Sequence, residues 1–246
     1  MTSNSLRRLI AAIALAVLLF LPDASAQLRS IAVYAGYASP FGKRIDVQRI
    51  DAVGGGVDIA YALTERVSMG LRGGYALYSI DQTDQLNRWG WVFWNDRYLN
   101  KIQADMRADP LLTSVIGSVQ KMDLIPVALH LDYAFAAAEQ FTVSPSVSGG
   151  VSFYTRRLYA DETWTKAFPA ANYSFTYNFR NFAPAKNGTV FHAGIGCMLH
   201  YRAFSFVNVS AAALYTQYLS TVNAAAYAGF PFENEMDIRL GLEFLY

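Results

Sequence analysis

Hydrophobic side chains occupy every second position in the last segment of the chain. Between Met236 and Tyr246 they alternate with glycine, charged residues and one leucine. Because successive side chains of a β-strand point to opposite faces, this period of two predicts a strand with one apolar face. Seven earlier segments show the same alternation, and we predict strands there as well, at 31–37, 57–63, 67–75, 125–135, 141–153, 191–201 and 207–215.

The connections between these eight predicted strands alternate in length. Three of them are tight turns, at 64–66, 136–140 and 202–204. The other four are longer, at 39–52, 81–120, 159–188 and 219–234. In an antiparallel up-and-down order, all the short connections fall at one end of the sheet and all the long ones at the other. An even number of strands with this asymmetry is typical of a transmembrane β-barrel.

The face of each strand opposite the apolar one carries small residues. They include Gly54, Gly56, Ala60, Ala62, Ser144, Ser146, Ser148, Gly150, Gly194 and Gly196. A solvent-exposed face would instead favour lysine, glutamate and threonine. Small residues suit the interior of a narrow barrel, where opposite walls approach each other, so we expect the apolar face to point outward to lipid. The alternative is an exported soluble barrel, lipocalin-like, with its apolar face inward.

Aromatic residues lie near both ends of the predicted apolar faces. Those near the short turns are Tyr61, Tyr133, Phe135, Phe141, Tyr201, Phe244 and Tyr246. Those toward the long connections are Tyr37, Tyr75, Phe153, Phe191 and Tyr215. Two aromatic rows flanking an aliphatic band are expected at the two interfaces of a membrane. The aromatic placement therefore favours the lipid-facing interpretation.

The tight turns also predict the register of three strand pairs. Centring each turn gives the facing pairs Asp58 with Arg72, Phe191 with Tyr215, and Phe135 with Phe141. The first pair places opposite charges across an antiparallel ladder, which is favourable. The third places Ser146 opposite His130 and Ser144 opposite Asp132.

The first 26 residues are predicted to be a cleaved signal peptide. Arg7 and Arg8 precede the apolar run from Leu9 to Leu21, and Ala24-Ser25-Ala26 matches a cleavage site. Removing them leaves 18 basic and 18 acidic residues in 27–246. This neutral chain lacks the basic excess of a nucleic-acid-binding protein, and its single cysteine, Cys197, excludes an internal disulfide framework.

The chain resembles the small eight-stranded outer-membrane barrels of the OmpA/OmpX type and the outer membrane β-barrel domain family. The resemblance covers nearly all of 28–246 and rests on strand count, loop asymmetry and the final Leu-Glu-Phe-Leu-Tyr246. It implies an all-β transmembrane barrel domain over 27–246, in the bacterial outer membrane, with short periplasmic turns and extracellular loops at 81–120 and 159–188. It also implies that Phe244 and Tyr246 are read by the barrel-assembly machinery.

Several charged and histidine side chains are predicted to face the barrel lumen. They are Asp58, Arg72, His130, Asp132, His192, His200, Asp237, Arg239 and Glu243. In an eight-stranded barrel the side chains fill the interior, and an unpaired buried charge is costly. We therefore expect paired charges that plug the lumen rather than an aqueous channel.

An alternative is a catalytic cluster of serine, histidine and aspartate around His130. His130, however, lies only five residues from a short turn, and the chain lacks a His-x-Ser-Asn motif of lipid-deacylating barrels. His192 and His200 lie about 27 Å apart along one strand, too far to share a metal ion. We predict no enzymatic activity and no catalytic, cofactor-binding or metal-binding residue; Cys197 is expected to face lipid.

The two longest predicted loops are rich in aromatic residues. The first contains Trp89, Trp91, Phe93 and Trp94 and then a short amphipathic helix over 98–108, with Leu99, Ile102 and Met106 on one face. The second contains Trp164 and a strand-like alternation over 173–179. These aromatics either pack the two loops together as a cap or form a binding surface.

The sequence therefore predicts a non-enzymatic outer-membrane barrel with a structural or surface-interaction role. Its expected partners are outer-membrane lipid and an extracellular ligand or protein at the loops, with no nucleic acid and no cofactor. The alternative is a narrow channel for small hydrophobic molecules, resembling the OmpW class. A lipid-modifying barrel enzyme is the third hypothesis.

Overall fold

The computed structural model describes residues 27–219 and 229–246. The predicted signal peptide, 1–26, and part of the predicted connection 219–234 lie outside the described residues. Within the described part the chain forms ten strands: β1 (Gln27–Lys43), β2 (Arg49–Ala62), β3 (Val67–Asp81), β4 (Leu112–Tyr133), β5 (Phe135–Ala138), β6 (Phe141–Phe168), β7 (Tyr173–Phe182), β8 (Lys186–Phe204), β9 (Val207–Tyr218) and β10 (Phe232–Leu245).

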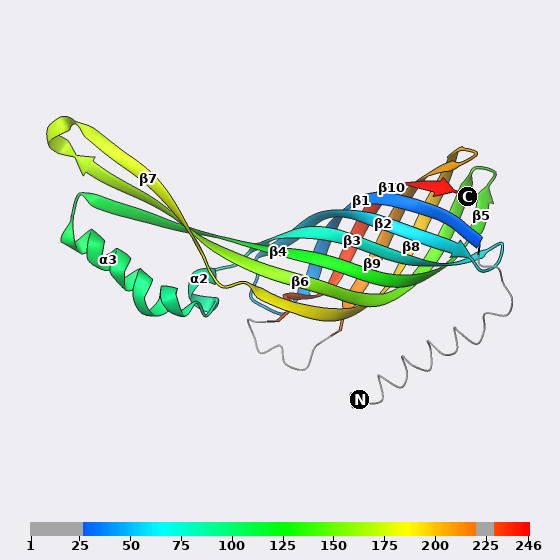
Figure 1. The fold of residues 1–246 in the computed structure, drawn as a ribbon, viewed down its shortest axis with the longest axis horizontal. Helices are drawn as coiled ribbons and strands as arrows, with labels where there is room; N and C mark the ends of the chain where they lie inside the picture. The colour runs from blue at the N-terminus through cyan, green and yellow to red at the C-terminus, as the bar shows by residue number, and fades with distance from the viewer. Residues whose placement is uncertain (1–26, 220–228) are drawn as a thin grey trace, which may run out of the picture.

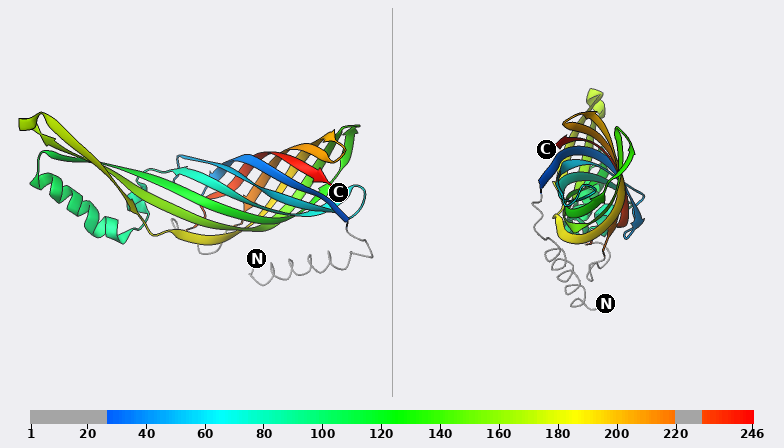
Figure 2. Two further views of the ribbon diagram at one scale, coloured as in Figure 1. Left: turned by 45° about the horizontal axis from the view of Figure 1, so that its top comes forward. Right: turned by 90° about the vertical axis from the view of Figure 1, so that its right-hand side faces the viewer.

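Eight of these strands close into an antiparallel ring (Figures 1 and 2). Its order is β1-β2-β3-β4-β6-β8-β9-β10, and β10 pairs back onto β1 from Ser30 opposite Leu245 to Lys43 opposite Phe232. The short β5 continues β4 to the tight turn and pairs with β6, so it adds nothing to the ring. The predicted eight-stranded up-and-down barrel is confirmed.

The outward face of the ring is apolar and exposed. Leu129 is 60% and Leu240 65% exposed, while the serines and charged side chains between such positions are buried or half-buried. Aromatic side chains are exposed at both ends of this face, among them Tyr133, Phe141, Phe244, Tyr37 and Phe191. This surface is that of a barrel whose surroundings are lipid, since water would drive these side chains inward. No helix in 27–219 or 229–246 is long and apolar enough to cross a membrane.

The first predicted register is confirmed. Asp58 faces Arg72 across β2 and β3. The turn that sets this register is tight because Thr64 Oγ1 accepts a hydrogen bond from the backbone N–H of Val67, at 3.0 Å. A side-chain hydroxyl that bonds backbone a few residues on is a recurrent way to fix such a turn.

The other two predicted registers are wrong. Tyr215 faces Ile195 rather than Phe191, because the turn follows Phe204, later than predicted, and the pairing shifts between Arg202 and Phe204. Phe135 faces Val143 rather than Phe141, because the turn lies at 139–140, later than predicted, and the pairing shifts between Ala136 and Ala138. Both displacements are even, by four and two residues, so the apolar faces still coincide.

The predicted loops 81–120 and 159–188 are also partly wrong, because much of each is strand. β4 begins at Leu112 and β6 continues to Phe168, beyond the ring. There β7 pairs with β6, forming a three-stranded sheet at one end of the molecule (Figure 1). The strand predicted over 173–179 therefore lengthens a hairpin and leaves the strand count of the ring unchanged.

Short helices accompany this outer sheet. They are α2 (Gln85–Arg88), the π-helix η1 (Trp94–Tyr98), α3 (Leu99–Ala108) and the 3₁₀ turn η2 (Pro169–Ala171). The amphipathic helix predicted over 98–108 is confirmed as α3, whose Ile102 is buried. We call residues 82–119 and 157–185, which lie beyond the ring, the extension.

We predict that Leu129→Arg destabilises the barrel strongly and Val115→Arg does not. Leu129 lies on β4 between Tyr133 and Ile125, which faces Phe153 of the other aromatic row. At this depth a charge facing lipid costs about 2–4 kcal/mol of unfolding free energy. Val115 lies on the same strand, is 72% exposed and belongs to the extension. Urea unfolding in phospholipid vesicles measures both variants; equal losses would contradict a lipid boundary between the two positions.

Candidate functional site

A charged cluster occupies the lumen against β2, β3 and β4. Nε of Arg72 donates to Asp58 Oδ2 at 2.7 Å. The ring of His130 lies between two carboxylates, with Nε2 2.8 Å from Asp58 Oδ1 and Nδ1 2.8 Å from Asp132 Oδ2. All four side chains are largely withdrawn from solvent. Buried charges are tolerated only when paired in this way.

The same contacts occupy both ring nitrogens of His130, around which the alternative catalytic cluster would lie. Both of its ring nitrogens already contact a carboxylate, so neither is left to take a proton from a serine. The register places Ser148, not Ser146, opposite His130. A nucleophile–base pair of the kind that acyl transfer requires is therefore not assembled at this histidine.

A second cluster lies on β1 and β10, next to β2 in the ring. Arg239 pairs with Asp237, with Nε 2.6 Å from Oδ2, and its guanidinium lies 4.5 Å from the centre of the Tyr34 ring. Tyr34 reaches from β1 across β2, where a Cβ at Gly56 would lie 2.5 Å from its hydroxyl. The glycine at this position therefore makes the room that the tyrosine occupies.

The remaining lumen candidates also have polar partners. His200 Nδ1 and Asn208 Nδ2 both lie 2.8 Å from Glu243 Oε2, and Ser152 Oγ lies 3.1 Å from His192 Nδ1. The structure thus places all nine candidates inside the ring but distributes them over separate clusters. In the described ranges no three His, Cys, Asp or Glu residues are arranged to hold a metal ion.

Two cavities lie between these clusters. The larger, about 300 Å³, is at the short-turn end, where Arg29, Gln140 and Tyr246 line it. The smaller, about 70 Å³, lies deeper, against Gly74, Pro126 and Glu235. Both are bounded by Tyr34, Arg72, Leu214 and Arg239. These four side chains form the constriction between the two cavities.

Between the smaller cavity and the extension, side chains fill the lumen. Tyr78 and Tyr218 donate to the two oxygens of Glu235, at 2.5 and 3.3 Å. Beyond them lies an apolar core that we call the plug, made of Ala38, Ile45, Val47, Ile50, Ala52, Tyr78, Ile80, Met122, Leu124, Tyr154, Val190, Tyr218, Phe230 and Phe232. The plug closes the end of the lumen that faces the extension.

Sequence reasoning missed the plug. Six of its members lie in connections that we predicted to be loops, namely Ile45, Val47, Ile50, Ala52, Phe230 and Phe232. Their apolar character was the available signal. A loop that is fully exposed to water has little need of aliphatic and aromatic side chains.

The extension has a hydrophobic core of its own. It consists of Trp89, Trp91, Trp94, Ile102, Leu158, Ala160, Trp164 and Ala183. Trp164 stacks on Tyr177 with nearly parallel rings, 6.4 Å between centroids. Of the two interpretations of the loop aromatics, the tryptophans therefore fit the one in which they pack the two segments together.

One buried carboxylate ties this second core together. Glu162 is 1% exposed and accepts hydrogen bonds from Tyr98 Oη at 3.0 Å, Trp164 Nε1 at 2.8 Å and Asn181 Nδ2 at 2.6 Å. Its three donors come from η1, β6 and β7. Three neutral donors can satisfy a buried carboxylate without a cation. The sequence showed no sign of this role, which depends on which segments meet.

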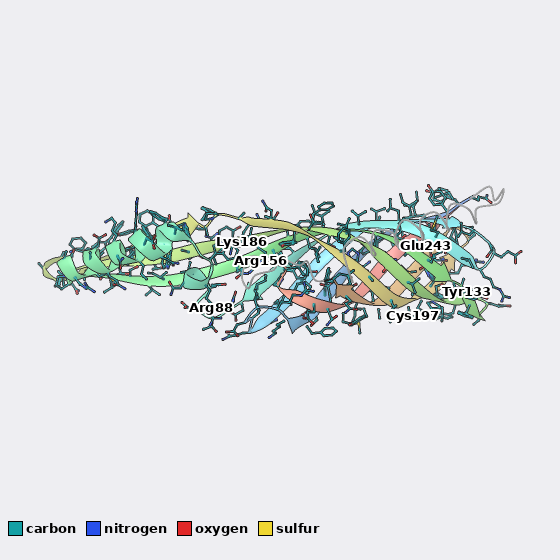
Figure 3. The ribbon with its side chains drawn as sticks, turned by 90° about the horizontal axis from the view of Figure 1, so that it is seen from below. Arg88, Tyr133, Arg156, Lys186, Cys197 and Glu243 are labelled. Carbon is teal, nitrogen blue, oxygen red and sulfur yellow. The ribbon has the colours of Figure 1, made fainter. Side chains whose placement is uncertain are left out.

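Two cations lie near the indole of Trp89 where the extension meets the barrel, and Figure 3 labels both of them, Arg156 and Lys186. The guanidinium of Arg156 lies 5.3 Å and Nζ of Lys186 4.7 Å from the ring centre of Trp89. Burial, and then the charge of Arg156, lower the pKa of Lys186 to about 8. The indole that both cations approach offsets part of the repulsion between their like charges.

Comparisons with known proteins give a fold and no family. No protein-family model matches the chain, and no curated protein matches it. Among solved structures, the attachment invasion locus protein Ail of Yersinia pestis aligns at 10% identity, over 90% of this chain and 99% of its own, with a TM-score of 0.42.

Two further structures align in a similar way. A major outer membrane protein from Thermus thermophilus shares 11% identity over 87% of this chain and 99% of its own, with a TM-score of 0.45. Neisserial surface protein A shares 10% identity over 88% of this chain and 96% of its own, with a TM-score of 0.43. Likenesses this distant carry no argument about ligand or activity.

We predict that Gly70→Ala destabilises the barrel by about 1–3 kcal/mol. A Cβ at this position would lie 2.3 Å from Nε2 of His130, so the ring would have to leave Asp58. Gly73 lies on the same strand, and a Cβ there meets nothing within 4 Å, so Gly73→Ala is the matched control. Urea unfolding in lipid vesicles compares the two; similar midpoints would contradict a tightly held His130.

Proposed function

We propose that this protein is a non-enzymatic outer-membrane barrel that anchors and displays the extension for contact with another surface molecule. The observation that carries this proposal is the presence of two separate cores. The plug fills the barrel on the extension side, and the tryptophan core holds the extension together beyond the ring. A barrel that is filled inside and elaborated outside is suited to recognition rather than to transport.

The outside of the extension supports this role. Phe93, Tyr173, Phe175 and Phe179 are each about half exposed. Aromatic side chains in the extension lie outside the lipid, so the membrane does not bury them. Clustered apolar groups exposed on such a surface mark contact sites. These side chains are the expected contacts of an extracellular ligand or protein.

The bacterial outer membrane as the location is part of the proposal. It is supported by the export signal predicted at 1–26 and by the apolar outward face of the ring. β10 closes the ring against β1, and its Phe244 and the following Tyr246 are exposed on the outside. Both aromatics are therefore accessible to the barrel-assembly machinery, which we expect as a partner together with outer-membrane lipid.

One observation favours the alternative, a path for small hydrophobic molecules. The ladder between β3 and β4 is interrupted between Gly73 opposite Val127 and Ala76 opposite Leu124. Pro126, which lacks an N–H, lies in this gap, and the smaller cavity lies behind it. A path from this cavity to the outside would require the plug to move, so recognition through the extension remains the better-supported function.

We predict that the barrel survives removal of the extension and that surface attachment does not. Ile80 faces Gln120, and Ala183 donates to the carbonyl of Leu158, so short turns can replace 82–119 and 159–182. Because the plug lies inside the ring, the shortened protein is expected to keep heat-modifiable migration and outer-membrane fractionation.

The measurement is attachment of bacteria that display the full-length or the shortened protein, to solid surfaces and to one another. We expect at least a tenfold loss of attachment for the shortened form. Equal attachment by the two forms, at equal surface amounts, would contradict the proposed function.

A further inference from the structure

β7 is an open edge of the extension sheet. It pairs with β6 on one side, and the sheet order beyond the ring is β4, β6, β7. Of its ten residues only Tyr177 and Asn181 are half-buried, and the others are exposed. The opposite edge, formed by the start of β4, differs because α3 packs beside it. One edge thus has a helix beside it, and the other presents unpaired backbone groups to the medium.

This edge lacks the features that usually keep an edge strand from pairing. Such strands carry lysines, prolines, bulges or inward charges. The segment Tyr173–Phe182 has no proline and no lysine, and its pairing with β6 runs without a register shift. Its single charge, Arg180, is held within its own sheet by Asp161, at 2.6 and 3.1 Å. The edge is therefore long, regular and effectively neutral.

The strand is also complementary to itself. Tyr173, Phe175, Tyr177 and Phe179 occupy one face, and Ser174, Thr176 and Asn178 occupy the other. When the same edge of two identical strands meets under a two-fold axis, the strands are antiparallel. Centred on Thr176, Tyr177 or Asn178, this pairing sets aromatic residues across from aromatic residues, which is favourable. In none of these three registers does Arg180 face its own copy.

We propose that β7 binds the β7 of a second copy of this chain, so that two extensions form one continuous sheet. The extension lies beyond one end of the barrel, along the long axis of the molecule (Figure 1). An antiparallel pair has its two-fold axis perpendicular to the strands, so the two barrels lie at opposite ends of the dimer. The partner is thus a copy in a facing membrane. This inference rests on the proposed function and names its ligand.

The contact between two β7 strands is small. Ten paired residues span about 34 Å of one strand edge, a contact at the small end of those that form stable complexes. A single pair is therefore weak, whereas many pairs between two crowded membranes add up. Clustering of vesicles that carry many copies is a more sensitive measurement than dimerisation of dilute protein.

The test uses full-length protein in phosphatidylcholine vesicles with the extension outward, followed by light scattering. Wild-type vesicles are expected to cluster. Thr176→Lys/Asn178→Lys vesicles are expected to stay dispersed, because lysines then face lysines across the axis, and Thr176→Glu/Asn178→Glu vesicles likewise. Mixing the lysine vesicles with the glutamate vesicles restores clustering, which a misfolded variant would not do.

The matched control places the same charges one strand away from the edge. Thr163 and Thr165 on β6 face Asn178 and Thr176 on the same side of the sheet. Thr163→Lys/Thr165→Lys vesicles are expected to cluster like the wild type. Dispersed wild-type vesicles, equal loss in this control, or no clustering in the mixture would each overturn the proposal. If vesicles stay dispersed while bacterial attachment to solid surfaces still requires the extension, self-pairing fails and the proposed function stands.

Discussion

Closure of the strand ring is the constraint on which the rest of this structure depends. In lipid no water can satisfy backbone N–H and C=O groups, so every strand needs a neighbour on both sides. The β1–β10 ladder supplies the last pairing. Closing a ring with eight strands leaves a narrow interior, and this explains why glycines such as Gly56 and Gly70 lie opposite Tyr34 and His130. Charged side chains in so narrow a space must find partners, and the lumen clusters show that they do.

The protein separates anchoring from display. Inside the ring, polar clusters give way to the plug, which ends the lumen before it reaches the extension. Beyond the ring, β4, β6 and β7 are no longer part of a closed barrel. There the tryptophans and the buried Glu162 form a second core. The ring has no open strand edge, whereas the extension leaves one edge of β7 unpaired.

The sequence predicted the ring well because its signal is local. Alternation marks each strand, and the tight turn beside Thr64 set the register of Asp58 with Arg72. The register near Ala203 escaped prediction because the alternation within β8 and β9 does not show where the turn between them lies, and the turn follows Phe204. The strand at 173–179 was predicted, but its pairing with β6 was not. The plug and the role of Glu162 depend on which distant segments meet, and one sequence alone does not determine that.

Access to the lumen is the most direct test of a barrel closed on its extension side. Ala212 lines the larger cavity, at the short-turn end. An Ala212→Cys variant in a Cys197→Ser background, inserted in vesicles with known orientation, can be labelled with a membrane-impermeant thiol reagent from either side. We expect labelling from the short-turn side only, because the constriction and the plug block the other route. Rapid labelling from the extension side would contradict a closed barrel.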